Sequence, residues 1–172
     1  SHYRADFQLS LNSSPVQFTK DDTVYKGWFE FLRELRLPGA AVCIEITENL
    51  LLAAGSKVGR RLEEFHQAGM QIALDDFGTG YSSLAYLKKF VLDYLKIDRS
   101  FVARLESDPH DQALCTAIIT VAHQMGFKVI AEGVETEAQL KFLQAAGCDL
   151  AQGHHFATAL PQDAFLAWLQ QG

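Results

Sequence analysis

Six short apolar runs recur along the chain, and each ends in one or two polar residues. The runs cover 7–11, 41–44, 71–74, 92–95, 127–131 and 149–151. The stretches between them are each long enough for one helix and its two loops. We expect helices at 22–37, 56–68, 82–90, 108–125, 136–146 and 161–171. This alternation predicts an α/β fold in which βα units build one parallel sheet.

Several of the expected helices have residues at their ends that are suited to close or cap a helix. Gly69, Gly126 and Gly147 each lie between an expected helix and the next apolar run. Glycine adopts a left-handed backbone conformation there without a Cβ clash. Thr136, followed by Gln139, predicts an N-cap with its partner at the third helical position.

The length of the chain decides how much of a barrel it can form. It has 172 residues, 48% of them hydrophobic and 21% charged, which suits one domain with a substantial core. A complete eight-fold βα barrel needs roughly 250 residues. With about six βα units, we expect an incomplete TIM-like βα barrel. Residues 1–172 then form one partial domain that lacks its N-terminal strands, and the chain is expected to be a fragment of a longer protein.

Charge and cysteine content exclude some classes of partner. The net charge is −6 and no basic stripe is present, so duplex nucleic acid is not an expected partner. Cys43, Cys115 and Cys148 show no Cys-x-x-Cys spacing, and we interpret them as buried reduced thiols in a cytoplasmic protein. No apolar run approaches the ~18 residues of a membrane span, although the parent protein has room for an anchor upstream.

The polar residues that end the apolar runs are the candidate functional residues. They are Asn12, Glu45, Asp75, Asp76, Lys96, Glu132 and Gln152. Ligands of parallel βα sheets bind at the carboxyl ends of the strands, so these side chains are expected around one mouth. Oxygen donors without histidine or cysteine suit Mg²⁺ or Mn²⁺. We expect two ions, because crowded carboxylates repel unless cations neutralise them, and such a pair activates water for displacement at phosphorus.

Lys96 lies between apolar residues, where an unpartnered lysine is costly to bury and nearby carboxylates would keep it charged. In a functional interpretation, Lys96 orients or helps to deprotonate an attacking water, or it neutralises phosphate charge. The structural alternative is an ion pair with Asp98. A third interpretation is an enolising site, in which the acids and the lysine act with Mg²⁺ on a carboxylate substrate.

Six segments of the chain carry a family resemblance. They are 12–15, 45–48, 75–84, 96–102, 131–136 and 152–153, of which the second reads Glu45-Ile46-Thr47-Glu48 and the third begins Asp75-Asp76-Phe77-Gly78-Thr79-Gly80. Together they resemble the EAL-domain family of bacterial phosphodiesterases. The resemblance implies metal-dependent hydrolysis of cyclic di-GMP to linear pGpG by a metal-activated water, in second-messenger signalling. The Glu-Ala-Leu signature is absent and is expected upstream of residue 1, so we expect the isolated fragment to be impaired.

The resemblance also implies a role for each matched residue. The residues that resemble the metal ligands are Asn12, Glu45, Asp75, Asp76 and Glu132. Lys96 resembles the catalytic lysine, and Glu48 the acid that holds the loop after Asp76. The residues on the substrate side are Gln152, Glu135 and Asp98. The loop and helix after Asp76 imply a homodimer interface, and an upstream sensor or GGDEF-type domain is compatible with the family.

One segment departs from the family pattern. His154 replaces the usual tyrosine, Thr158 the usual basic residue and Ala159 the usual proline. We interpret His154 and His155 as loop residues and not as metal ligands. The departures favour the alternative of a catalytically degenerate cyclic di-GMP receptor, whereas the intact acids and Lys96 favour the enzyme.

Overall fold

The structure is a computed structural model that describes residues 7–14, 18, 23–53, 56–78 and 87–171. Its strands are β1 (Leu9–Asn12), β2 (Val42–Thr47), β3 (Gln71–Phe77), β4 (Tyr94–Ile97), β5 (Lys128–Ala131) and β6 (Leu150–Ala151). Its helices are α2 (Thr23–Glu34), α3 (Glu48–Ala53), α4 (Ser56–Gln67), α6 (Arg99–Val102), α7 (Pro109–Gln124), α8 (Glu137–Ala145) and α9 (Gln162–Gln171), with a 3₁₀ turn at Gly39–Ala41.

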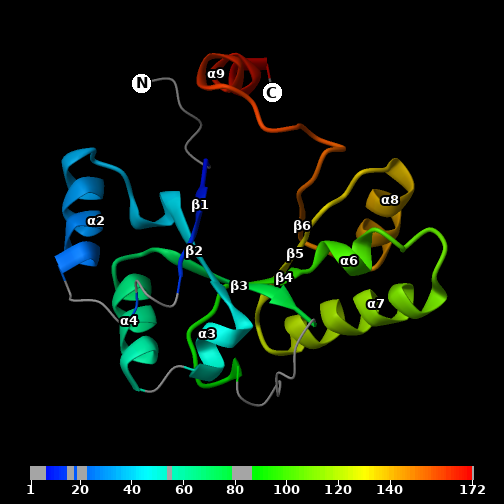
Figure 1. The fold of residues 1–172 in the computed structure, drawn as a ribbon, viewed down its shortest axis with the longest axis horizontal. Coiled ribbons are helices and arrows are strands. Elements are labelled where there is room, and N and C mark those ends of the chain that lie inside the picture. Colours follow the sequence, from blue (N-terminus) through cyan, green and yellow to red (C-terminus); the bar gives the residue numbers. More distant parts are fainter. Residues whose placement is uncertain (1–6, 15–17, 19–22, 54–55, 79–86, 172) are drawn as a thin grey trace.

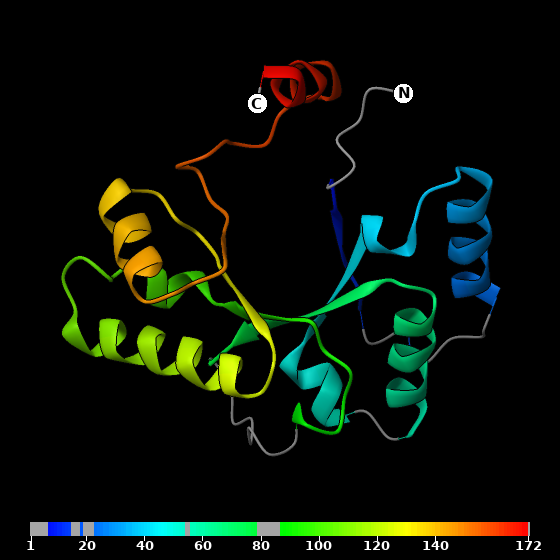
Figure 2. The same cartoon turned by 180° about the vertical axis from the view of Figure 1, so that it is seen from behind.

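The six described strands form one parallel sheet in the order β1-β2-β3-β4-β5-β6. Helices α2, α3 and α4 lie beside one part of the curved sheet, and α6, α7 and α8 lie beside the other part (Figures 1 and 2). Helix α9 is close to Phe7, two residues before β1, because the ring centroids of Phe7 and Phe165 are 6.0 Å apart. The predicted α/β fold is confirmed, as an open half-barrel of the TIM-like type.

The structure corrects several predicted boundaries. Strand β2 continues to Thr47 and β3 to Phe77, so Glu45 and Asp75 lie within strands instead of after them. The reason is the register, because Thr47 pairs with Asp75 and backbone pairing therefore continues past the polar residues. Helix α2 ends at Glu34, earlier than predicted, since Arg36 has a left-handed φ of 55°. Most of the helix predicted at 82–90, and of the loop before it, lies outside the described residues.

The local helix signals are confirmed where the structure describes them. Gly69, Gly126 and Gly147 have φ angles of 82°, 87° and 87°, as expected for residues that close a helix. Thr136 accepts a hydrogen bond from the backbone N–H of Gln139, whose side chain accepts one from the backbone N–H of Thr136. These boundaries follow from local backbone chemistry.

The three cysteines are free thiols, as predicted, although one of them is only half-buried. Cys43 and Cys115 are buried, and Cys148 is intermediate. Burial raises the pKa of the Cys43 and Cys115 thiols to about 12, and that of Cys148 to about 11. All three thiols are therefore protonated near neutral pH. Among the described helices, none has the length and apolar character needed to cross a membrane.

A short sequence pattern occurs at two helix-to-strand junctions. Residues 66–72 and 123–129 share His-Gln-x-Gly, followed by an apolar, a polar and a β-branched residue. Each junction is bound by an aspartate from later in the chain, which is Asp93 directly before β4 and Asp149 directly before β6. Asp93 accepts a hydrogen bond from the backbone N–H of Ile72 at 2.8 Å, and Asp149 accepts one from that of Val129 at 2.8 Å.

The histidine of each junction faces the same aspartate. His123 Nε2 lies 2.8 Å from Asp149 Oδ2, whereas His66 Nε2 lies 3.8 Å from Asp93 Oδ1. Asp93 thus links the end of α4 to β3, and Asp149 links the end of α7 to β5. The α7–β5 junction is the tighter of the two.

We expect replacement of Asp149 with alanine to lower the free energy of unfolding by about 1–3 kcal/mol, because the Val129 N–H loses its acceptor. Burial raises the pKa of Asp149, but hydrogen bonds from His123 and Val129 outweigh this effect and lower the pKa below its ordinary value. The contribution of Asp149 is therefore complete above the ordinary aspartate pKa, and it is lost as pH falls through the lowered value. Urea unfolding at about pH 7 and about pH 3 should show the variant approach the wild type at the lower pH.

The two histidines provide a matched comparison for this junction. His123→Ala should destabilise the chain more than His66→Ala, because the distance from the ring to its aspartate is 2.8 Å in one case and 3.8 Å in the other. Equal losses of stability would contradict a specific role for the shorter contact.

Candidate active site

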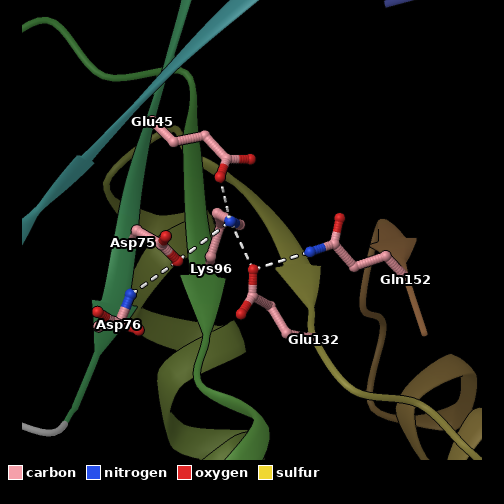
Figure 3. A network of polar contacts seen from close by, with 6 residues as sticks. All are labelled: Glu45, Asp75, Asp76, Lys96, Glu132 and Gln152. Atoms are coloured by element: carbon pink, nitrogen blue, oxygen red, sulfur yellow. Dashed lines mark hydrogen bonds and ion pairs between the residues drawn. The ribbon is translucent and has the colours of Figure 1, made fainter. Parts of the chain in front are cut away.

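Three carboxylates converge on the side chain of Lys96 at the carboxyl ends of the strands (Figure 3). Lys96 Nζ lies 2.6 Å from Glu45 Oε2, 3.1 Å from Asp75 Oδ1 and 2.5 Å from Glu132 Oε1. The lysine comes from β4, and the three acids come from β2, β3 and the end of β5. Lys96 is only 2% exposed, so this is a buried cation held by carboxylates. We call Lys96, Glu45, Asp75 and Glu132 the carboxylate–lysine cluster.

The alternation of side chains along each strand places the cluster above a small apolar layer. That layer consists of Cys43, Ala73, Tyr94 and Ile130, which pack together apart from the main core. Two residues further along each strand, on the same face, lie Glu45, Asp75, Lys96 and Glu132. Residues on the opposite face, such as Ile44 and Leu74, belong to the main core. A strand period of two therefore separates the polar layer from the helix-packing face.

The charges of the cluster fix the protonation state of Lys96. Burial lowers the pKa of Lys96, but hydrogen bonds and charges from Glu132 and Glu45 outweigh burial and raise that pKa above its ordinary value. Burial raises the pKa of Glu132, and Lys96 opposes this effect. The charged form of Lys96 is therefore favoured in this arrangement. An ammonium suits an orienting or charge-neutralising role.

Three other predicted residues lie next to the cluster. Gln152 Nε2 donates a hydrogen bond to Glu132 Oε1 at 2.8 Å, so the end of β6 is linked to the cluster. Asp76 has a left-handed φ of 57°, its backbone N–H donates to Asp75 Oδ1 at 2.9 Å, and its carboxylate points away from Lys96 (Figure 3). Asn12 is the last residue of β1 and pairs in register with Glu45.

The remaining predicted residues do not contact the cluster. Asp98 Oδ1 accepts a hydrogen bond from the backbone N–H of Ser100 at 2.9 Å and caps α6. Lys96 pairs with the three acids of the cluster, so the structural alternative of a Lys96–Asp98 ion pair is wrong. Glu48 is 5% exposed, and its carboxylate oxygens have no hydrogen-bond partner among the described residues. Its predicted partner, the loop after Asp76, lies mostly outside that part of the chain. Glu135 is exposed and its carboxylate is unpaired within the described structure.

The segment that departs from the family pattern is tied to the loop between β5 and α8. A Cβ on Gly153 would lie 2.2 Å from the carbonyl oxygen of Val134, so the two backbones are in close contact. The backbone N–H of His155 donates to that same carbonyl at 3.0 Å, and its ring Nε2 lies 3.3 Å from Glu137 Oε2. These contacts agree with the interpretation of His155 as a loop residue.

The donor set fits a hard divalent cation. Glu45, Asp75, Asp76 and Glu132 supply carboxylate oxygens, and Asn12 supplies an amide oxygen, which are the ligands that Mg²⁺ and Mn²⁺ prefer. With three carboxylates around one ammonium, the cluster also has a net negative charge. The carboxylates point at Lys96, and within the described ranges no three acidic, histidine or cysteine side chains form a ready-made metal site. Each of the three acids contacts Lys96 through one oxygen, so the second oxygen of each carboxylate is not part of these ion pairs.

Sequence reasoning missed one charged residue at this edge of the sheet. Arg99 begins α6, two residues after the end of β4. A cation directly after a strand end in a parallel sheet was the available signal.

Comparison with known proteins identifies the family. The family model described as the EAL domain matches residues 1–159. The cyclic di-GMP phosphodiesterase NbdA of Pseudomonas aeruginosa is 41% identical over 144 residues, which cover 82% of this chain and 18% of NbdA. The chain spans 18% to 25% of the length of eight curated relatives that it matches.

Solved structures agree with this assignment. The PaMucR phosphodiesterase in complex with c-di-GMP matches with a TM-score of 0.86 and 35% identity, over 94% of this chain and 65% of that one. The manganese/cy-diGMP complex of Klebsiella pneumoniae BlrP1 matches with a TM-score of 0.81 and 31% identity, over 89% of this chain and 39% of that one. From the shared motifs, the half-barrel and the family match together, the chain belongs to the EAL domain family.

Proposed function

We propose that this chain is the catalytic part of a metal-dependent phosphodiesterase that hydrolyses cyclic di-GMP to linear pGpG. The observation that carries the proposal is the carboxylate–lysine cluster, in which Glu45, Asp75 and Glu132 surround the buried Lys96. A relative named as a cyclic di-GMP phosphodiesterase and structures named as complexes with this dinucleotide support it.

The proposed metal ligands are the oxygen donors of the mouth. They are Asn12, Glu45, Asp75, Asp76 and Glu132. Bound Mg²⁺ or Mn²⁺ would supply Lewis-acid stabilisation of a phosphoryl oxygen and lower the pKa of a water. Two ions are proposed because the four carboxylates carry four negative charges, whereas Lys96 and a single divalent ion together supply three positive charges. A pair of ions also activates water for displacement at phosphorus.

The protein's own groups have distinct proposed roles. Lys96 is protonated, so it orients the attacking water through a hydrogen bond and offsets negative charge that develops at phosphorus. Gln152 holds Glu132 through its 2.8 Å hydrogen bond and thereby fixes one wall of the cluster. Burial of Lys96 keeps bulk water away from the ammonium and strengthens each of these interactions.

Other proposed roles extend outward from the cluster. Asp98, Glu135 and Gln152 remain the proposed substrate-side residues, and Glu48 the residue that supports the loop after Asp76. A homodimer through that loop and its helix remains a proposal. The alternative, a receptor that binds without cleaving, is less well supported, because a receptor has no need of a cluster that holds a charged lysine among three acids.

The test is conversion of cyclic di-GMP to pGpG by the purified chain, followed by chromatography. For the isolated chain we expect weak turnover with Mg²⁺ or Mn²⁺, none in EDTA, and recovery when excess Mn²⁺ is added back. Tight binding of cyclic di-GMP without product would support the receptor instead. Equal turnover with and without EDTA would refute the metal dependence.

A further inference from the structure

Arg99 is a cation at the carboxyl-terminal edge of the sheet. No described residue forms an ion pair with it. It is exposed and begins α6, directly after the helix cap Asp98. Its guanidinium forms no hydrogen bond or ion pair with a described residue, whereas Lys96 is buried and occupied by three carboxylates. Of these two cations, Arg99 is therefore the one that remains accessible to a ligand.

The side chain of Arg99 lies against the loop that carries Glu132. A Cβ placed on Gly133 would lie 2.7 Å from Arg99 Cβ and 3.9 Å from its Cγ. Gly133 has a φ of +69°, so glycine suits this position both sterically and conformationally. The first part of the Arg99 side chain thus packs against the β5–α8 connection, at the residue that follows Glu132.

We propose that Arg99 binds the phosphate of cyclic di-GMP that is not being hydrolysed and so sets the preference for a cyclic dinucleotide. This inference rests on the proposed function. The substrate carries two phosphodiesters, and a bound metal together with Lys96 would compensate the charge of one. The second approaches a mouth of net negative charge and needs its own cation. An exposed guanidinium offers paired donors that match phosphate oxygens.

The experiment compares Arg99→Ala with Arg33→Ala, which removes the same charge from the exposed end of α2. Binding of cyclic di-GMP is measured by calorimetry in Ca²⁺, and steady-state rates in Mn²⁺. Arg99→Ala should raise Kd and KM roughly tenfold or more while kcat changes little, and Arg99→Lys should recover part of the loss. Hydrolysis of bis(p-nitrophenyl) phosphate, which has one phosphodiester, should be the same in Arg99→Ala and wild type.

The outcomes separate this inference from the proposed function. If the wild type binds and hydrolyses cyclic di-GMP and Arg99→Ala matches Arg33→Ala, the assignment of Arg99 is overturned and the phosphodiesterase stands. An equal loss on both substrates also overturns it, because Arg99 would then act at the attacked phosphate or on the fold. A wild type that neither binds nor hydrolyses cyclic di-GMP refutes both.

Discussion

Replacing Lys96 with methionine is expected to abolish measurable hydrolysis of cyclic di-GMP and to destabilise the chain. The substitution keeps the length of the side chain but removes the ammonium that contacts Glu45, Asp75 and Glu132. Loss of a positioned charge at a reacting phosphate costs on the order of 10²–10⁴-fold in rate. Breaking a buried ion pair by removing one partner costs about 3–5 kcal/mol, because the remaining charges stay buried without compensation.

The pH dependence of the stability of Lys96→Met distinguishes the loss of the ammonium charge from a simple loss of packing. The raised pKa of Lys96 means that its stabilising contribution is present below the ordinary lysine pKa and is lost only at strongly alkaline pH. In the variant, the carboxylates prefer to be protonated, so its deficit should shrink as pH falls from about 8 to about 5. Urea unfolding across this range measures the effect.

Lys141→Met is the matched control for Lys96→Met. Lys141 Nζ lies 3.4 Å from Glu137 Oε1 on the surface of α8, and its side chain is 71% exposed. Its replacement should change stability by less than about 1 kcal/mol and leave turnover intact. A Lys96→Met chain as stable and as active as this control would show that the cluster is neither structural nor catalytic.

Replacing Asp75 with asparagine removes the negative charge of this side chain at the proposed metal site but keeps its size and shape. Asparagine keeps the oxygen that accepts a hydrogen bond from the backbone N–H of Asp76 at 2.9 Å, so we expect the backbone there to hold. It removes one anionic ligand, and hard divalent ions bind neutral amide oxygen less strongly than carboxylate. We expect turnover to fall by at least about 10²-fold. The Mn²⁺ concentration for half-maximal activity should increase as well.

Asp108→Asn provides a control with the same chemical change. Asp108 caps α7 by accepting a hydrogen bond from the backbone N–H of His110 at 2.8 Å, and asparagine caps helices equally well. This variant should match the wild type in activity and in its Mn²⁺ titration. If Asp75→Asn behaves in the same way as Asp108→Asn, Asp75 is not a metal ligand.

Much of the fold was readable from the sequence because it depends on local chemistry. Alternating apolar runs and helical segments gave the six strands, and the left-handed φ angles at Gly69, Gly126 and Gly147 follow from the absence of a Cβ. Helix α2 was an exception. The sequence predicted its end near Pro38-Gly39, but the chain leaves the helix at Glu34 and takes a left-handed turn at Arg36, a residue with no local preference for that conformation.

Strand period and chain direction are properties of each βα unit, so the residues that reach the mouth could be predicted without the tertiary structure. The sequence by itself did not determine the partner of Lys96. Asp98 is two residues away in sequence, yet it turns to cap α6, while Glu45, 51 residues distant, lies 2.6 Å from the ammonium. Only the parallel register of β2, β3, β4 and β5 decides which side chains share a layer, since pairing between strands is a long-range property. The same register places Arg99 against Gly133, which no local pattern encodes.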